Sequence, residues 1–199
     1  TKIISHTAPP YCLLWTPNSI VIAGCDKRVI SYSQDGRLLQ QFDYSRDENE
    51  RELCSAGASP SGLSVAVGSY DRLRLFDWNS RRGGWEEGKT KEIQYLYSIS
   101  CIAWKPDGSK LIIGTMCGGV HMFDCALKRS RLKANFEVIH VGPSQFIVRN
   151  TESEQSAVIR SRQGQEVQEV KLMGQDRFVV AYTPETVILA DTASGKYSE

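Results

Sequence analysis

The sequence predicts an all-β fold of four-stranded antiparallel sheets of the β-propeller type, because one pattern occurs three times along the chain. Each copy has a tight turn, a short apolar run that ends in glycine, and a second strand that ends in an aromatic residue. The three glycines, Gly24, Gly68 and Gly114, lie 44 and 46 residues apart. Blades with this spacing bury their faces by packing side by side, so functional residues are expected mainly in the loops of the two rims.

The strands of each unit follow from the same pattern. The first unit is expected to contain strands at Tyr11–Trp15, Ser19–Ala23, Val29–Ser33 and, after the Asp35-Gly36 turn, Arg37–Phe42. The second is expected to contain Leu53–Ala58, Ser64–Gly68, Leu73–Trp78 and an outer strand between Trp85 and Ile93. The third is expected to contain Ile99–Trp104, Lys110–Gly114, Val120–Asp124 and Arg131–Phe136. Lys2-Ile3-Ile4, before the Pro9-Pro10 breaker, is interpreted as the outer strand of an earlier unit.

The pattern weakens after Phe136. Strand-like runs follow without the proline turn, at Val138–Val141, Gln145–Arg149 and Ser156–Arg160, and the repeat returns only at Phe178–Tyr182 and Val187–Asp191. The distance from Asp124 to Asp191 is 67 residues, which is not a multiple of the period. We therefore expect residues 1–136 to be the last blades of a first propeller and residues 137–199 the first blades of a second. The incomplete repeats at both ends predict a piece of a larger protein, with a self-contained five-blade ring as the alternative.

Composition predicts a soluble intracellular chain. Hydrophobic residues make up 41% and charged residues 24%, and the formal net charge of +1 gives no overall attraction to nucleic acid or to acidic membranes. The sequence shows neither a signal-peptide pattern nor a run of 18 apolar residues. Its six cysteines are scattered and form no C-x-x-C pair, which favours small apolar core residues over a disulfide framework.

The repeats resemble WD40 repeats. Phe76-Asp77-Trp78 and Phe123-Asp124 stand where a Trp-Asp dipeptide usually ends the third strand, although the Gly-His dipeptide and the full buried hydrogen-bond tetrad are missing. Several loop sequences, which generic WD40 features do not explain, are more specifically similar to the intraflagellar transport 172 family. They are residues 10–26, 42–47, 68–74, 95–97, 114–120, 141–145 and 169–171.

This resemblance implies a function. Members of that family are subunits of intraflagellar transport complex B, with two N-terminal propellers followed by a helical tail, and they act as non-enzymatic scaffolds for other complex B subunits. It implies a location in the cytoplasm, the cilium or flagellum and the basal body, and no cofactor, nucleic acid or small-molecule substrate. The family pattern provides no catalytic residues, and the helical tail is absent from this sequence.

The residues themselves also argue against catalysis and metal binding. The one Cys/His cluster is Cys117, His121 and Cys125, but strand residues four apart are roughly 13 Å apart, too far to share a tetrahedral ion. No nucleophile-elbow or phosphate-loop motif occurs. We therefore expect no enzyme and no metal site.

A lipid-binding propeller is the alternative function. Arg81-Arg82-Gly83-Gly84 resembles the phosphoinositide-binding loop of autophagy-related propellers. Ser80 replaces the phenylalanine of that family, the motif lies in a hairpin loop, and Glu86 and Glu87 follow it. Paired arginines at a hairpin tip are otherwise typical of a solvated, salt-bridged turn.

The candidate partner-binding residues lie in loops expected on one rim. The charged connection Asp43–Glu52 joins the first unit to the second, on the same rim as the loops between second and third strands. This rim would contain Asp26, Arg46, Asp47, Tyr70 and Asp71. Mixed charge with an aromatic residue is typical of protein interfaces. A mobile, solvated loop with no binding role would have the same composition. Trp15 and Trp104, each two residues before a turn proline, are expected in the core.

Overall fold

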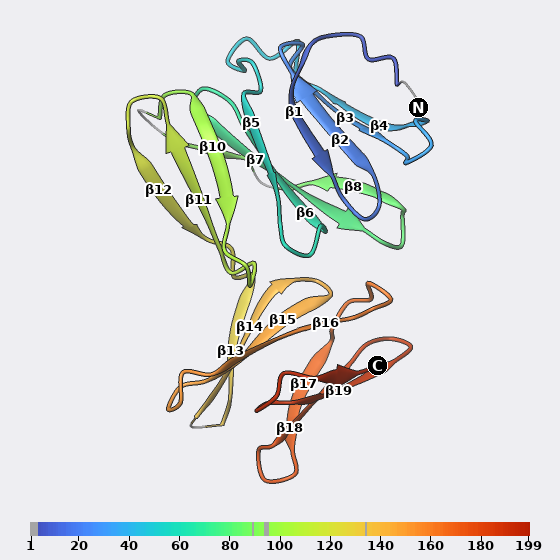
Figure 1. Cartoon of the computed structure of the whole chain (residues 1–199), viewed down its shortest axis with the longest axis vertical. Helices are drawn as coiled ribbons and strands as arrows, with labels where there is room; N and C mark the ends of the chain where they lie inside the picture. Colours follow the sequence, from blue (N-terminus) through green and yellow to red (C-terminus); the bar gives the residue numbers. More distant parts are fainter. Residues whose placement is uncertain (1–3, 89, 94–95, 134) are drawn as a thin grey trace. The chain divides into compact units, whose positions relative to one another are not determined.

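The computed structural model describes residues 4–88, 90–93, 96–133 and 135–199. Within these residues all regular elements are β-strands, arranged in five antiparallel sheets (Figure 1). The predicted all-β fold built from WD40-type four-stranded sheets is therefore confirmed. The chain divides into two compact units, the first up to Phe123 and the second from Asp124 onward.

The first unit contains three sheets whose strands follow one another in chain order. The first sheet comprises β1 (Pro10–Trp15), β2 (Ile20–Gly24), β3 (Arg28–Tyr32) and β4 (Leu38–Asp43). The second comprises β5 (Ser55–Ala58), β6 (Ser64–Gly68), β7 (Arg72–Asn79) and β8 (Gly84–Glu87), and the short β9 (Lys91–Glu92) pairs with the other end of β7. The third comprises β10 (Ile99–Trp104), β11 (Lys110–Thr115) and β12 (Val120–Asp124).

The first strands of these three sheets lie side by side, with β5 between β1 and β10. Gly57 on β5 makes the close approach of β10 possible, since a Cβ there would stand 2.9 Å from the Ile102 side chain. The indole Nε1 of Trp104 donates a hydrogen bond to the Gly57 carbonyl oxygen at 3.2 Å. Successive sheets therefore meet along their first strands, as propeller blades do.

The three repeat glycines all lie on the second strand of their sheet, as the repeat predicts: Gly24 and Gly68 end β2 and β6, and Gly114 is the residue before the last of β11. Gly68 pairs with Ser55 and Gly114 with Cys101, whereas Gly24 pairs with Pro10 beyond an irregularity in β1. At Gly68 a Cβ would stand 2.7 Å from the side chain of Ile99 in the next sheet, so the repeat needs glycine there for packing.

The first and second sheets enclose a common core. Phe76 and Trp85 are its large buried side chains, and the Trp85 indole donates a hydrogen bond to Ser19 Oγ at 2.9 Å. The core prediction for Trp15 is wrong, because its side chain is 70% exposed and shares the uncovered face of β1 with Tyr11 and Leu13. Trp104 is partly buried, by its contact with Gly57.

The second unit contains two sheets of four strands. One comprises β13 (Lys128–Lys133), β14 (Phe136–Gly142), β15 (Gln145–Asn150) and β16 (Ser156–Arg160). The other comprises β17 (Glu169–Met173), β18 (Phe178–Tyr182), β19 (Val187–Asp191) and β20 (Tyr197–Ser198). The strand predicted at Arg131–Phe136 as the last of the third sheet is wrong: β13 pairs with β14 instead, because Leu132 packs against the core of the second unit.

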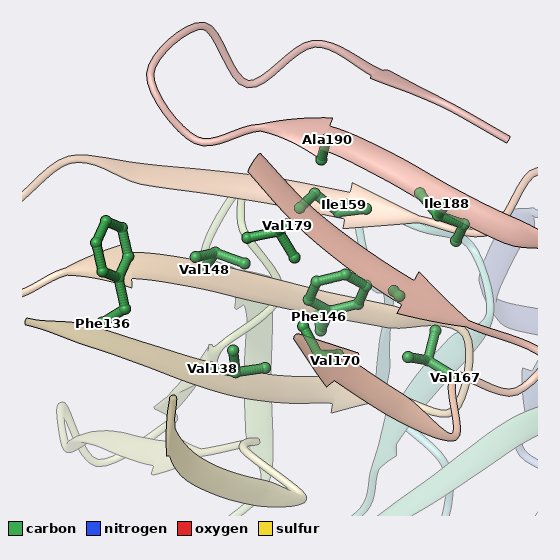
Figure 2. Packing of buried hydrophobic residues seen from close by; sticks show 11 residues of the cluster. Phe136, Val138, Phe146, Val148, Ile159, Val167, Val170, Val179, Ile188 and Ala190 are labelled. Carbon is green, nitrogen blue, oxygen red and sulfur yellow. The ribbon is translucent and has the colours of Figure 1, made fainter. Parts of the chain in front are cut away.

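The core of the second unit is apolar. Phe146, Val148 and Ile159 on one sheet face Val179 and Ile188 on the other, as Figure 2 shows. Phe146, Val179 and Ile188 are fully buried. The two sheets therefore pack face to face through interdigitating side chains.

Other sequence expectations have mixed outcomes. Lys2 and Ile3 lie outside the described residues, while Ile4 belongs to no strand and packs against the Ile20 and Tyr32 cluster. Of the six cysteines, only Cys12 is buried. The assignment of residues 1–136 and 137–199 to two propellers stays a prediction.

Candidate functional site

The connection between the first two sheets is folded onto the loops of both. We call residues Tyr44–Cys54 the rim segment. Its Tyr44 amide donates to the Lys27 carbonyl at 3.0 Å, and its Leu53 amide to the Gly24 carbonyl at 3.2 Å. Cys54 then donates to the Gly68 carbonyl at 2.8 Å, so the segment joins the β2–β3 loop to the second sheet.

The segment begins at a charged turn. Asp43 Oδ1 accepts a hydrogen bond from the Ser45 amide at 2.9 Å, and Asp43 Oδ2 accepts one from Arg28 Nε at 3.0 Å. Hydrogen bonds from the Ser45 hydroxyl and amide, helped by Arg28, lower the pKa of Asp43 to about 2. Asp43 is therefore ionised wherever the protein is folded near neutral pH.

A buried carboxylate fixes the middle of the rim segment. Glu50 is 0% exposed, and its Oε2 accepts a hydrogen bond from Arg74 Nε at 2.9 Å. Its other oxygen, Oε1, accepts one from the Ser69 hydroxyl at 2.6 Å. Because both carboxylate oxygens are paired with donors, burial of this charge is compensated.

Two arginines of β7 extend this contact into an ion-pair cluster. Arg74 also donates to Glu87 Oε1 at 2.6 Å, and its guanidinium lies 3.8 Å from the centroid of the Tyr44 ring. Arg72 Nη1 lies 2.6 Å from Asp47 Oδ2, and its Nη2 lies 3.1 Å from a Glu92 oxygen. We use the term ion-pair cluster for Asp47, Glu50, Asp71, Arg72, Arg74, Glu87 and Glu92.

The sequence-predicted rim residues Asp47 and Asp71 meet at Arg72. Hydrogen bonds from the Asn49 amide and then from Arg72 lower the pKa of Asp47. Asp71 is held less firmly: its Oδ1 lies 3.8 Å from Arg72 Nε, and neither of these buried atoms has a hydrogen-bond partner in the described structure.

The remaining rim residues do not join this cluster among the described contacts. Tyr70, between Ser69 and Asp71, is 41% exposed, and its ring makes an edge contact with Tyr97 at a centroid distance of 5.9 Å. Asp26 accepts a hydrogen bond from the Arg28 amide at 3.3 Å, and Arg46 is exposed on the rim segment. Neither Asp26 nor Arg46 is bonded to the cluster among the described contacts. A common binding role for the five residues stays a prediction.

Sequence reasoning missed Glu50, Arg72 and Arg74. The signal is the alternation in β7, where residues two apart share a face of the sheet. Arg74 and Phe76 lie on one face, and Phe76 is buried in the core, so Arg74 must enter the core with a carboxylate partner. Nothing in the sequence singles out Glu50 as that partner among the acidic residues of the segment.

The arginine pair lies at the β7–β8 turn. The Arg81 and Arg82 amides donate to Asn79 Oδ1 at 2.9 and 3.1 Å, and Gly83 adopts a φ of 63° that closes the turn. Both side chains are exposed, and Arg82 forms an ion pair of 2.8 Å with Glu86. Glu86 thus offsets one of the two positive charges. Lipid contact through Arg81 and Arg82 stays a prediction.

Metal-binding clusters and membrane-spanning helices are both absent from the described residues. His, Cys, Asp and Glu side chains form no group of three or more suited to a metal ion, and Cys117, His121 and Cys125 are not such a group. The described part of the chain also contains no helix with the length and apolar character needed to cross a membrane.

Comparison with known proteins gives one consistent result. The chain is similar over its full length to intraflagellar transport protein 172 homologues at 36–53% identity. The homologue of Rattus norvegicus is 53% identical over 198 residues and the protein of Chlamydomonas reinhardtii 36% identical over 199, each covering 100% of this chain. The chain spans 11% of the length of these relatives. The intraflagellar transport protein 80 homologue of Rattus norvegicus is 31% identical over 132 residues, or 66% of this chain and 15% of that protein. No protein-family model matches.

Proposed function

Because the whole chain matches one segment of intraflagellar transport protein 172, we propose that it is a non-enzymatic interaction scaffold of intraflagellar transport complex B. It would support assembly and maintenance of cilia and flagella, and act in the cytoplasm, at the basal body and in the cilium. Its partners would be other complex B subunits, bound without a cofactor or a small-molecule substrate.

One observation supports the proposed location of the binding surface on this rim. The rim segment is fixed by its buried carboxylate to Ser69 and Arg74 and by Asp47 to Arg72, so the stretch of backbone that carries Tyr70 and Asp71 is held on both sides. Binding to a preorganised surface loses less conformational entropy than ordering a mobile loop. This favours the rim with Tyr70 and Asp71 over a solvated loop without a binding role.

The test is an affinity measurement between the full chain and purified complex B subunits. Tyr70→Ala with Asp71→Lys is expected to weaken binding by about 5- to 150-fold, because loss of an interface aromatic costs roughly 1–3 kcal/mol. Reversing Asp47 as well is a less specific test, since Asp47 holds Arg72 and its loss also loosens the rim segment.

Tyr182→Ala is the matched control. Tyr182 is 36% exposed, close to the 41% of Tyr70, but lies on β18 of the second unit. Its loss should leave the affinity within about twofold. Unchanged binding by the folded double variant would place the interface elsewhere, first of all at the turn with Arg81 and Arg82.

The alternative function is a peripheral membrane or phosphoinositide-binding propeller. The observation in its favour is that both arginine side chains are exposed on a turn fixed by Asn79. It predicts flotation of the chain with vesicles containing a phosphoinositide, loss of flotation at high salt, and loss in Arg81→Ala/Arg82→Ala. Flotation that survives this double substitution would remove the arginine pair from the hypothesis.

A further inference from the structure

Three residues with exposed apolar side chains lie on neighbouring, hydrogen-bonded segments beside the ion-pair cluster. Tyr70 is 41% exposed, Tyr97 52% and Met116 74%. They come from the β6–β7 loop, the residues before β10 and the β11–β12 turn. We call these three residues the tyrosine patch. Large exposed apolar groups that are adjacent, rather than scattered singly, mark interaction surfaces.

Backbone hydrogen bonds hold the three segments together. The Ile99 amide donates to the Ser69 carbonyl at 3.1 Å, next to Tyr70, and the Met116 amide donates to the Ser98 carbonyl at 2.9 Å, next to Tyr97. The Tyr70 and Tyr97 rings meet edge to face, with an interplanar angle of 79°. Both tyrosines are partly exposed, and the electron-rich face of a tyrosine ring attracts cations.

The surroundings of the patch are negatively charged. Asp71, the residue after Tyr70, belongs to the ion-pair cluster, in which five carboxylates oppose two guanidinium groups, a formal net charge of −3. The side chain of Asp71 is 43% exposed and that of Glu92 71%. The nearby Lys91 ammonium lies 5.1 Å from the Phe123 ring centroid and forms no part of the cluster. A negative patch favours basic partners and disfavours phosphate groups of lipids or nucleic acids.

We propose that the tyrosine patch binds a basic segment of a partner protein, with an arginine side chain stacked on Tyr70 or Tyr97 and paired with Asp71. Arginine suits both contacts, because its planar guanidinium stacks on aromatic rings and its fork of donors matches a carboxylate. The thioether of Met116 adapts to varied apolar stems. This inference names the partner chemistry of the rim and rests on the proposed function.

The three methionines provide a test that needs no substitution. Met116 lies on the patch, whereas Met122 on β12 is 64% exposed and Met173 on β17 is 55% exposed, so they are matched controls for exposure. The full chain, labelled with 13C at the methionine methyls, is titrated with a decapeptide of alternating arginine and serine. The Met116 methyl resonance is expected to shift saturably while the Met122 and Met173 resonances stay unchanged. A peptide that binds without moving Met116 would overturn the proposal.

Charge and ring contributions are then separated. The same peptide with glutamate in place of arginine should not shift Met116, and an equal shift would overturn the proposal. Tyr97→Ala is expected to weaken arginine-peptide binding at least fivefold, while Tyr97→Phe, which keeps the π face, should stay within about twofold. Binding equal to wild type in both Tyr97→Ala and Tyr70→Ala, each shown to be folded, would show attraction by charge alone and overturn the stacking contact. If Tyr97→Ala fails to fold, Tyr70→Ala tests the ring contribution and the methionine shifts test the site.

The two proposals fail in different ways. If the arginine peptide shifts Met116 but no complex B subunit binds the chain, the scaffold function is wrong while the partner chemistry stands. If complex B subunits bind and Met116 does not respond to them or to the peptide, the patch is wrong while the scaffold function stands.

Discussion

The first unit carries buried charges between its sheets and its rim segment, whereas the core of the second unit consists of aliphatic and phenylalanine side chains. Glu50 is 0% exposed and Arg74 7% exposed in the first unit, while Phe146 and Ile159 are 0% exposed in the second. Both units use the same antiparallel sheets. The comparison teaches that sheet packing needs only apolar side chains, and that the buried ions serve to attach a loop to a strand.

The largest effect is expected in the apolar core of the second unit. Phe146→Ala removes a ring that is completely buried, and the cavity it leaves should lower the free energy of unfolding of that unit by about 3–5 kcal/mol. Amide hydrogen exchange of peptides from β14–β16 measures this, and exchange in the first unit should change little. A loss below about 1 kcal/mol would mean that the core is not packed as described.

A somewhat smaller effect is expected at the buried ions. Glu50→Ala leaves Arg74 buried with only Glu87 as its anion, so the first unit should lose about 2–4 kcal/mol. The rim segment should exchange its amides fastest. The double variant Glu50→Met/Arg74→Leu is the control, and it should recover part of the loss because apolar replacement removes both charges. If the double variant is as unstable as Glu50→Ala, the cost is one of shape rather than of unpaired charge.

The smallest effect is expected on the stability of the first unit at acidic pH. The pKa of Asp43 is about 2 in the folded chain against an ordinary value of 3.8, so its contribution to stability is present above pH 3.8 and is lost as pH falls toward 2. Asp43→Asn should therefore flatten the pH dependence of urea unfolding of the first unit between pH 5 and 2.

A comparison with the second unit sharpens this prediction. The Ala193 amide lowers the pKa of Asp191 there, so Asp191→Asn should flatten the acid dependence of the second unit alone. Equal effects of either variant on both units would show that acid unfolds the chain as one cooperative body.

The sequence was sufficient for the strands of the first unit because turn, apolar run and glycine repeat there in register. It failed at β13, where the expected spacing placed Arg131–Phe136 in the third sheet. A strand with alternating basic residues carries little information on which neighbour it pairs with. In the structure, β13 pairs with β14, and Leu132 packs against the core of the second unit.

The candidate site was predictable in its loops but not in its contacts. Loop type placed Asp47 and Asp71 on one rim, and the structure brings both to Arg72. Glu50 was hidden because a charged loop residue usually faces water. Trp15 was misplaced for the opposite reason, since a tryptophan is usually covered and nothing in its own strand shows whether a neighbour covers it.

The close approach of β5 and β10 constrains how the chain can evolve. Gly57 and Ile102 are 45 positions apart in the sequence, yet a methyl group on Gly57 would require a smaller side chain at 102. Among related sequences, residues larger than glycine at position 57 should therefore occur together with alanine at position 102, because valine would keep the γ-methyl that a Cβ at position 57 meets. Successive repeats therefore cannot diverge independently, because the size of a residue on β5 limits the size of the residue packed against it on β10.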